Sequence, residues 1–153
     1  MLAKDIMKRE VYVLKKGDTV ESAIAKLMEY NISGMPVVDD NNQLVGILTE
    51  TDIVTKSKKL DVPNYFPSFF PLFDTKKYLD KVNNLDEKMK EMINSKVEDV
   101  MTEEVFSVEE DVALEEIVKL MATKGVHRIP VVAEGKVVGI ITQKDIIKAY
   151  ANK

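Results

Sequence analysis

The sequence contains no cysteine and a single histidine, His127, among its 153 residues. The lack of cysteine excludes a disulfide framework and any thiolate site, and it leaves the redox compartment undetermined. With one histidine and no thiol, we expect neither a zinc site nor a Cys-His nucleophile. There is no Gly-x-Ser-x-Gly elbow and no Walker-type phosphate loop, and no pair of carboxylates stands out as catalytic. We therefore expect no catalytic residues, no metal and no enzyme activity.

Long apolar runs and an excess of positive charge are also missing. No run approaches the roughly 20 apolar residues of a membrane span, and the start, MLAKDIMKRE, lacks the long apolar region of a signal peptide. The formal net charge of −4 gives no electrostatic footprint for nucleic acid. Hydrophobic residues make up 45% and charged residues 31%, which is typical of a globular protein. We expect a cytoplasmic protein that binds neither nucleic acid nor membrane.

The most informative feature that the sequence does contain is a repeat. The stretch VVAEGKVVGIITQKDII, residues 131–147, has an earlier counterpart, VVDDNNQLVGILTETDIV, at residues 37–54. One offset of 94 residues relates the two copies up to the turn, and an offset of 93 relates them after it, as for Asp52 and Asp145. Each copy predicts the order β-α-β-β-α. Two such units predict a pseudo-two-fold pair that buries one common core.

Hydrophobic periodicity predicts the individual elements. Apolar residues at helical spacing indicate a helix over about residues 19–30 and its counterpart over 113–124. The strands expected in the first copy are 11–14, 35–38 and 44–48, those expected in the second copy include 105–108 and 129–132, and a further helix is expected from Thr49 to about Lys58. Pro36 is expected at the first residues of its strand, because proline cannot donate a ladder hydrogen bond.

A segment without a counterpart, roughly residues 56–96, separates the copies. It begins with LDVPNYFPSFFPLF, in which prolines alternate with aromatic residues and exclude a regular helix or central strand. Residues 75–93 then predict an amphipathic helix. So much apolar surface is not expected in a solvated linker, and three interpretations stay open: a cap on the core, an oligomer interface or a lid. We expect a homodimer, with this insert close to the subunit boundary or folded over a cleft rim.

The element Thr-x-x-Asp occurs once in each copy, at residues 49–52 and 142–145. Both instances fit a helix capping box. Both also follow a strand that contains a glycine, Gly46 or Gly139, which permits close approach by a neighbour or a ligand. A helix N-terminus attracts phosphate, and an aspartate carboxylate can accept two hydrogen bonds from a ribose diol. The helix cap and a nucleotide site can therefore coexist on the same residues.

A second candidate is the His127-Arg128 pair at the entry to a strand. Such a pair is often ordinary surface, but here it lies in the same repeat as Thr142 and Asp145, in a loop suited to an anion binder. The equivalent positions of the first copy are Ser33 and Gly34, which are small and uncharged. If both copies form pockets, the two pockets therefore differ in charge.

Taken in order, these motifs resemble a known family. The Asp-(Ile/Val)-Met start, the (Met/Ile)-Pro-Val-Val strand and the Gly-Ile-(Leu/Ile)-Thr-x-x-Asp end are similar to the cystathionine β-synthase (CBS) domain, and two in tandem resemble a Bateman module. The resemblance implies an α/β (α+β) fold of two pseudo-symmetric β-α-β-β-α repeats packed through their sheets. The expected divisions are residues 3–58 for the first repeat, 59–96 for the aromatic and helical insert and 97–150 for the second repeat.

The resemblance also implies a ligand and its contacts. CBS clefts bind adenosine derivatives such as AMP, ADP, ATP or S-adenosylmethionine. Ribose hydroxyls would go to Asp52 and Asp145, with Thr49 and Thr142 near the ribose or phosphate. The complete set of expected ligand contacts is Thr142, Lys144, Asp145, His127, Arg128, Ile140, Thr49, Asp52, Ser33 and Ile47, with the purine against the isoleucines and the phosphates near His127 and Arg128.

The sequence and the resemblance together predict a regulatory module that senses an adenine nucleotide in clefts between the CBS repeats and reports it to an unidentified effector protein. No catalytic cofactor is expected. The alternative is a structural or protein-interaction module with unoccupied clefts, in which the aromatic insert provides the working surface. The presence of both Thr-x-x-Asp elements argues against this alternative. The sequence names neither the adenosine ligand nor the regulated partner.

Overall fold

The structure, a computed structural model, describes residues 1–56 and 90–153. These residues form two compact units. One unit contains residues 1–13, 36–46 and 103–153, and the other contains residues 14–35, 47–56 and 90–102. Each unit is therefore assembled from both repeats, and the segment at the start of the chain belongs with the second repeat.

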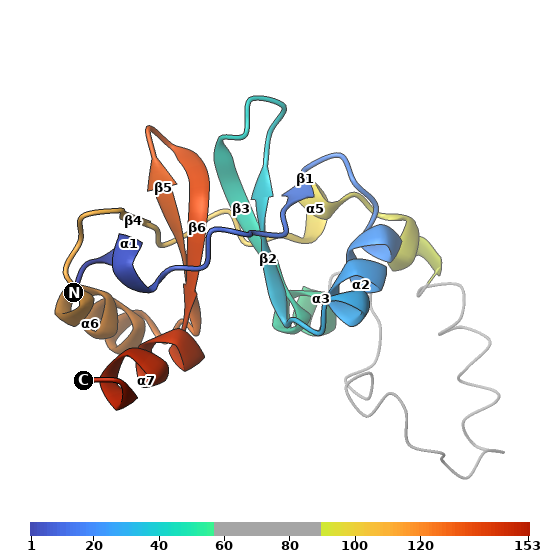
Figure 1. Cartoon of the computed structure of the whole chain (residues 1–153). Coiled ribbons are helices and arrows are strands. Elements are labelled where there is room, and N and C mark those ends of the chain that lie inside the picture. The colour runs from blue at the N-terminus through green and yellow to red at the C-terminus, as the bar shows by residue number, and fades with distance from the viewer. Residues whose placement is uncertain (57–89) are drawn as a thin grey trace, which may run out of the picture. The chain divides into compact units, whose positions relative to one another are not determined.

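Figure 1 labels the helices and strands of the chain. In order they are α1 (Ala3–Ile6), β1 (Leu14–Lys15), α2 (Val20–Glu29), β2 (Gly34–Val38), β3 (Leu44–Thr49), α3 (Glu50–Lys56), α5 (Val97–Val100), β4 (Val108–Glu109), α6 (Leu114–Lys124), β5 (Arg128–Ala133), β6 (Lys136–Thr142) and α7 (Gln143–Ala151). Residues 90–94 are also helical. The predicted order β-α-β-β-α is confirmed twice, as β1-α2-β2-β3-α3 and as β4-α6-β5-β6-α7.

The strands form two three-stranded sheets, β1-β2-β3 and β4-β5-β6. In the second sheet β4 runs parallel to β5, and β6 runs antiparallel to β5. The register places Arg128 opposite Thr142 and Val131 opposite Gly139. The chain therefore has the expected α/β class, built from two mixed sheets that carry helices.

Two strand predictions need correction. The strand expected over residues 11–14 is paired only at Leu14–Lys15, and its counterpart over 105–108 only at Val108–Glu109. Pairing begins at the residue whose side chain is buried, Leu14 or Val108. The preceding apolar residues are only partly buried or exposed, so the β-favouring composition of the run did not locate the paired residues.

The second correction concerns the prolines, which lie inside their strands. Pro36 is the third residue of β2, and Pro130 is the third residue of β5. In the second sheet the short strand β4 pairs only with Val131 and Val132. On that side of β5, Pro130 therefore faces no partner that would require its missing N–H, and the proline is tolerated in a middle strand.

Local chemistry explains the start of α2 and the ends of α2 and α6. Thr19 caps α2, because its side chain accepts a hydrogen bond from the Ser22 amide at 3.2 Å. Asn31, just beyond the helix, has a φ of 51°. In the second repeat Gly125 ends α6 with a φ of 65°, a left-handed conformation that costs glycine little. The predicted helices over 19–30 and 113–124 are thus confirmed to within about one residue.

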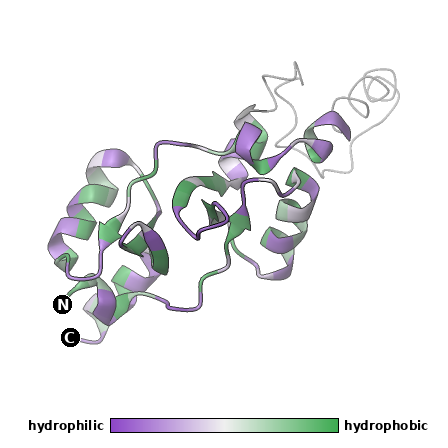
Figure 2. Ribbon diagram, turned by 90° about the horizontal axis from the view of Figure 1, so that it is seen from above, coloured by the Kyte–Doolittle hydropathy of each residue, from purple (hydrophilic) through white to green (hydrophobic). Residues whose placement is uncertain are grey.

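A hydrophobic cluster fills the first unit. Its buried members come from α1 and the residue that follows it, from α6 and α7, and from the sheet β4-β5-β6. They are Ala3, Met7, Val108, Leu114, Ile117, Met121, Ile129, Val131, Ile141 and Ile146. Figure 2 shows that the helices carry hydrophilic and hydrophobic residues side by side, as expected of helices with one buried face. Ala3 and Met7 show that the start of the chain contributes to the core of the second repeat.

The segment 1–13 is held against β6 by backbone pairing. Lys8 and Ile140 exchange two hydrogen bonds, with N···O distances of 2.9 and 3.0 Å. The adjacent Met7 then lies against Gly139, because a Cβ built on that glycine would come within 2.9 Å of the Met7 Cγ. The sequence predicted close approach to this glycine by a neighbouring residue or by a ligand. In the structure the group that approaches Gly139 is the Met7 side chain.

Within the described ranges, no helix combines the length and the apolar character that crossing a membrane would require. The aromatic stretch, including Phe66, Phe69, Phe70 and Phe73, and most of the helix expected over 75–93 lie outside the described residues. The predictions made for this insert therefore stay predictions.

The packing of Met7 on Gly139 gives a first test. Gly139→Ala should lower the free energy of unfolding by about 1–3 kcal/mol, since the added methyl group overlaps Met7. Urea denaturation measures this change. Gly17→Ala is the matched control, because nothing lies within 4 Å of its added methyl group, and its effect should stay within about 0.5 kcal/mol. In a Met7→Ala background the penalty at residue 139 should shrink, and an unchanged penalty would contradict the packing argument.

Candidate functional site

The element Thr142–Asp145 is a helix cap in the structure. The Asp145 Oδ2 atom accepts hydrogen bonds from the Thr142 amide at 2.8 Å and from the Thr142 hydroxyl at 2.7 Å. In return the Asp145 amide donates to the Thr142 Oγ1 atom at 3.4 Å, which completes the capping box of α7. The Asp145 carboxylate is only 6% exposed.

The first repeat contains the same arrangement. The Asp52 Oδ2 atom accepts from the Thr49 amide at 2.9 Å and from the Thr49 hydroxyl at 3.1 Å, and the Asp52 amide donates to Thr49 Oγ1 at 3.2 Å. Asp52 is 7% exposed. The helix-cap interpretation is therefore confirmed in both copies. In each copy the cap uses one of the two carboxylate oxygens, Oδ2.

The other oxygen, Oδ1, has a different partner in each copy. Asp145 Oδ1 lies 3.4 Å from the Lys8 ammonium nitrogen. Asp52 Oδ1 accepts a hydrogen bond from the Thr102 hydroxyl at 2.6 Å. Lys8 and Thr102 are equivalent positions, because each follows the methionine of the Asp-(Ile/Val)-Met motif. The two carboxylates thus meet a cation in one copy and a neutral hydroxyl in the other.

Backbone pairing positions both partners. Thr102 and Ile47 exchange two hydrogen bonds of 2.8 and 2.9 Å, matching the pair between Lys8 and Ile140. The predicted purine contacts, Ile47 and Ile140, are therefore the strand residues on which the two leading segments lie. Both isoleucines are half-buried.

Backbone hydrogen bonds and strand pairing hold other predicted residues close to the two helix caps. The His127 carbonyl accepts a hydrogen bond from the amide of Gln143, the first residue of α7, and the Ser33 carbonyl accepts one from Glu50, the first residue of α3. Arg128 lies opposite Thr142 in the sheet. The structure brings His127 and Arg128 to the strand end that carries the Asp145 cap.

Lys144 is an exposed residue in the first turn of α7, next to the buried Asp145. Sequence reasoning missed Lys8 and Thr102 as contacts of the two carboxylates. The only sequence signal for them was their common position after Met7 and Met101.

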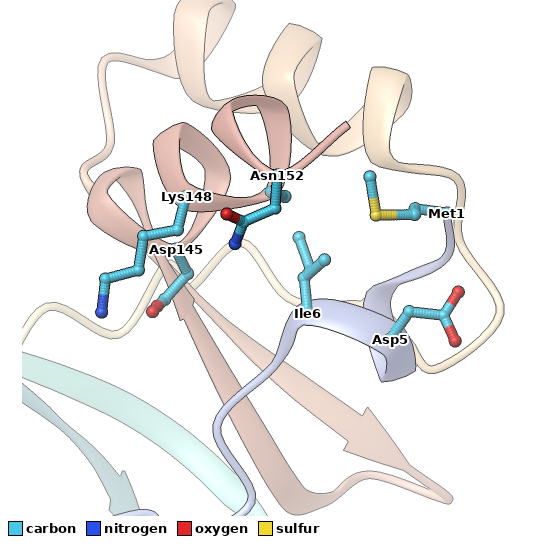
Figure 3. Close-up of a pocket in the computed structure, with 7 residues that line it drawn as sticks. Met1, Asp5, Ile6, Asp145, Lys148 and Asn152 are labelled. Carbon is cyan, nitrogen blue, oxygen red and sulfur yellow. The ribbon is translucent and has the colours of Figure 1, made fainter.

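A shallow pocket of about 290 Å³ lies between α1 and α7 (Figure 3). Its lining consists of Met1, Asp5, Ile6, Asp145, Lys148, Ala149 and Asn152. Of the predicted ligand contacts, Asp145 alone lines this pocket. Its volume is close to the lower limit of typical small-molecule sites. In residues 1–56 and 90–153, no group of three or more His, Asp or Glu side chains is placed to hold a metal ion.

Proteins of known structure share this architecture. The CBS-pair protein CBSX2 of Arabidopsis thaliana matches with a TM-score of 0.75 and 26% identity, over 99% of this chain and 94% of that one. A crystal structure of CBSX2 in complex with AMP matches with a TM-score of 0.72 and 27% identity, over 99% of this chain and 96% of that one. The paired β-α-β-β-α architecture of this chain is therefore one that CBS-pair proteins of known structure share.

The CBS domain model matches residues 3–59 and 97–152, so this chain belongs to the CBS domain family, with two domains in tandem as a Bateman module. An uncharacterized protein of Methanocaldococcus jannaschii, MJ1426, is 36% identical over 97% of this chain and 90% of its own length. The chain also matches an inosine-5'-monophosphate dehydrogenase of that organism, with 34% identity, but covers only 23% of the enzyme's length.

The hydrogen bond between Thr102 and Asp52 gives a second test. Thr102→Val should lower the free energy of unfolding by about 1.5–3 kcal/mol, because a buried carboxylate oxygen loses its hydroxyl donor. Thr102→Ser keeps the hydroxyl, so its free energy of unfolding should fall much less. Chemical denaturation of the two variants separates the effects. A clear loss in Thr102→Ser with little loss in Thr102→Val would show that the methyl group, and not the hydrogen bond, is what matters.

Proposed function

We propose that this chain is a regulatory module that binds an adenosine-type ligand at its Thr-x-x-Asp sites and signals its presence to a separate effector protein. The observation that carries the proposal is the duplicated buried carboxylate, which keeps one oxygen, Oδ1, outside the helix cap in each copy. The AMP complex of the related CBSX2 supports the choice of ligand class.

The proposed contacts follow from the geometry of each cap. A ribose diol presents two hydroxyl donors, and the lone pairs of the carboxylate oxygen outside the cap, Oδ1, can accept from both. The ribose would therefore go to Asp145 or Asp52, with the purine against Ile140 or Ile47. Phosphate groups would favour the Asp145 site, where Arg128 lies opposite Thr142 and supplies charge-assisted donors. The exposed His127 and Lys144 add donors to the same site.

Signalling requires that the ligand bind one conformation better than another. A ligand that does so shifts the population toward the favoured state, by no more than its difference in affinity. This role calls for binding without turnover, so no catalytic residue is assigned. The homodimer and the cytoplasmic location stay predictions. The exposed side chains of Ile147 and Tyr150 on α7 support a search for a dimer by sedimentation.

Ligand binding is tested by thermal denaturation with AMP, ADP, ATP, S-adenosylmethionine, NAD and cyclic di-AMP. A ligand at 100 times its Kd should stabilise the fold by about 2.7 kcal/mol, which corresponds to a rise in Tm of about 5–10 °C for a chain of this size. No shift with any of the six compounds would contradict the proposal.

Matched variants assign the shift to the sites. Asp145→Asn and Asp52→Asn each keep an acceptor for the helix cap but lose the carboxylate. Each variant should remove binding at its own site, and the double variant should show no shift. A full shift in the double variant would place the ligand elsewhere.

A further inference from the structure

We propose that Lys8 determines ligand specificity at the Asp145 site: it selects adenosyl ligands that carry an anionic group over neutral ones. Thr102, its counterpart, makes no such selection at the Asp52 site. This inference rests on the proposed function, because it concerns which adenosine compounds the two sites prefer. Lys8 is not in the set of ligand contacts expected from the resemblance.

The two oxygens of each carboxylate have different partners. In both copies Oδ2 is committed to the threonine amide and hydroxyl that start the helix. Only Oδ1 can be offered to a ribose without breaking the cap. In the structure that oxygen is already engaged, by the Lys8 ammonium in one copy and by the Thr102 hydroxyl in the other. A ribose must therefore displace this internal partner or share the Oδ1 atom with it.

Lys8 can move its charge while its backbone stays in place. The backbone is anchored by the two hydrogen bonds to Ile140, and the neighbouring Met7 is packed on Gly139. The Lys8 side chain, in contrast, is 54% exposed, so its ammonium can leave Asp145 without disturbing the core. An ammonium on a flexible four-carbon stem can follow a ligand group over several ångströms.

The outcome of displacement depends on the charge of the ligand. A neutral nucleoside takes Oδ1 and leaves the displaced ammonium without an anionic partner. A ligand with a phosphate near the ribose gives that ammonium a new charge-assisted hydrogen bond. At the other site the displaced Thr102 hydroxyl is uncharged, so water can replace its partner for either kind of ligand. The lysine therefore favours the anionic ligand only at the Asp145 site.

The neighbouring cations of the described residues, Arg9 and Lys148, form no ion pair with Asp145. Arg9, the next residue, forms an ion pair with Glu110 at 3.6 Å. Lys148 lines the pocket between α1 and α7. Among the ion pairs within the described residues, the one that involves Asp145 is formed by Lys8. The same short stretch thus contains a lysine directed at the candidate site and an arginine directed at a glutamate, which provides an internal control.

The test replaces Lys8 by threonine and Thr102 by lysine, and it measures the Kd values of AMP and adenosine by calorimetry. Each site is isolated by inactivating the other, with Asp52→Asn for the Lys8 site and Asp145→Asn for the Thr102 site. Lys8→Thr should weaken AMP binding about tenfold and leave adenosine within about twofold, a size typical of one charge-assisted hydrogen bond. Thr102→Lys should do the reverse at the other site, tightening AMP relative to adenosine. Lys8→Gln, which keeps the chain length, should behave like Lys8→Thr.

Arg9→Thr removes the same charge one residue away and should leave the ratio of the two Kd values unchanged. An equal loss of AMP and adenosine binding in Lys8→Thr, or the same change in Arg9→Thr, would overturn the assignment of specificity to Lys8. Failure of the wild-type chain to bind either compound would instead contradict the proposed function. The two failures are therefore distinguishable.

Discussion

The backbone pairing of Lys8 with Ile140, and of Thr102 with Ile47, is the constraint on which the candidate sites depend. In each case a leading segment lies along a strand that leads directly into the Thr-x-x-Asp cap of the next helix. The register of this pairing matters, because a slip of one residue in an extended segment turns every side chain to the opposite face. With the observed register, Met7 meets the strand glycine and the next side chain reaches the carboxylate. Packing and polar contact are set by the same two hydrogen bonds.

Local features were predictable because their causes lie within a few residues. A threonine and an aspartate three residues later can satisfy each other's backbone donors, so both capping boxes could be predicted from four-residue windows. Helical spacing located α2 and α6. The offset between copies, 94 residues before the turn and 93 after it, predicted that an element formed in one repeat forms in the other as well. Membership of the CBS family followed from the order of these motifs.

The contacts of the second carboxylate oxygen were not predictable in this way. Thr102 lies 50 residues from Asp52, and Lys8 comes from the opposite end of the chain to Asp145. The repeat pattern assigns Lys8 to the first copy, whereas the structure places it on a strand of the second. Composition also misplaced β1, since the β-favouring run 11–14 contains only one fully buried residue, Leu14. Pairing follows burial, and burial depends on the whole fold.

The composition of the two units has a consequence for how the chain is held together. A cut anywhere between residues 56 and 90 would give two fragments, and each fragment would supply segments to both units. In topological terms the two repeats exchange segments within a single polypeptide, much as two subunits do in a domain-swapped dimer. A single repeat isolated from its twin would keep its aspartate but lose the leader that completes the surroundings of that aspartate. Duplication here therefore supplies the missing part of each half, in addition to doubling the number of sites.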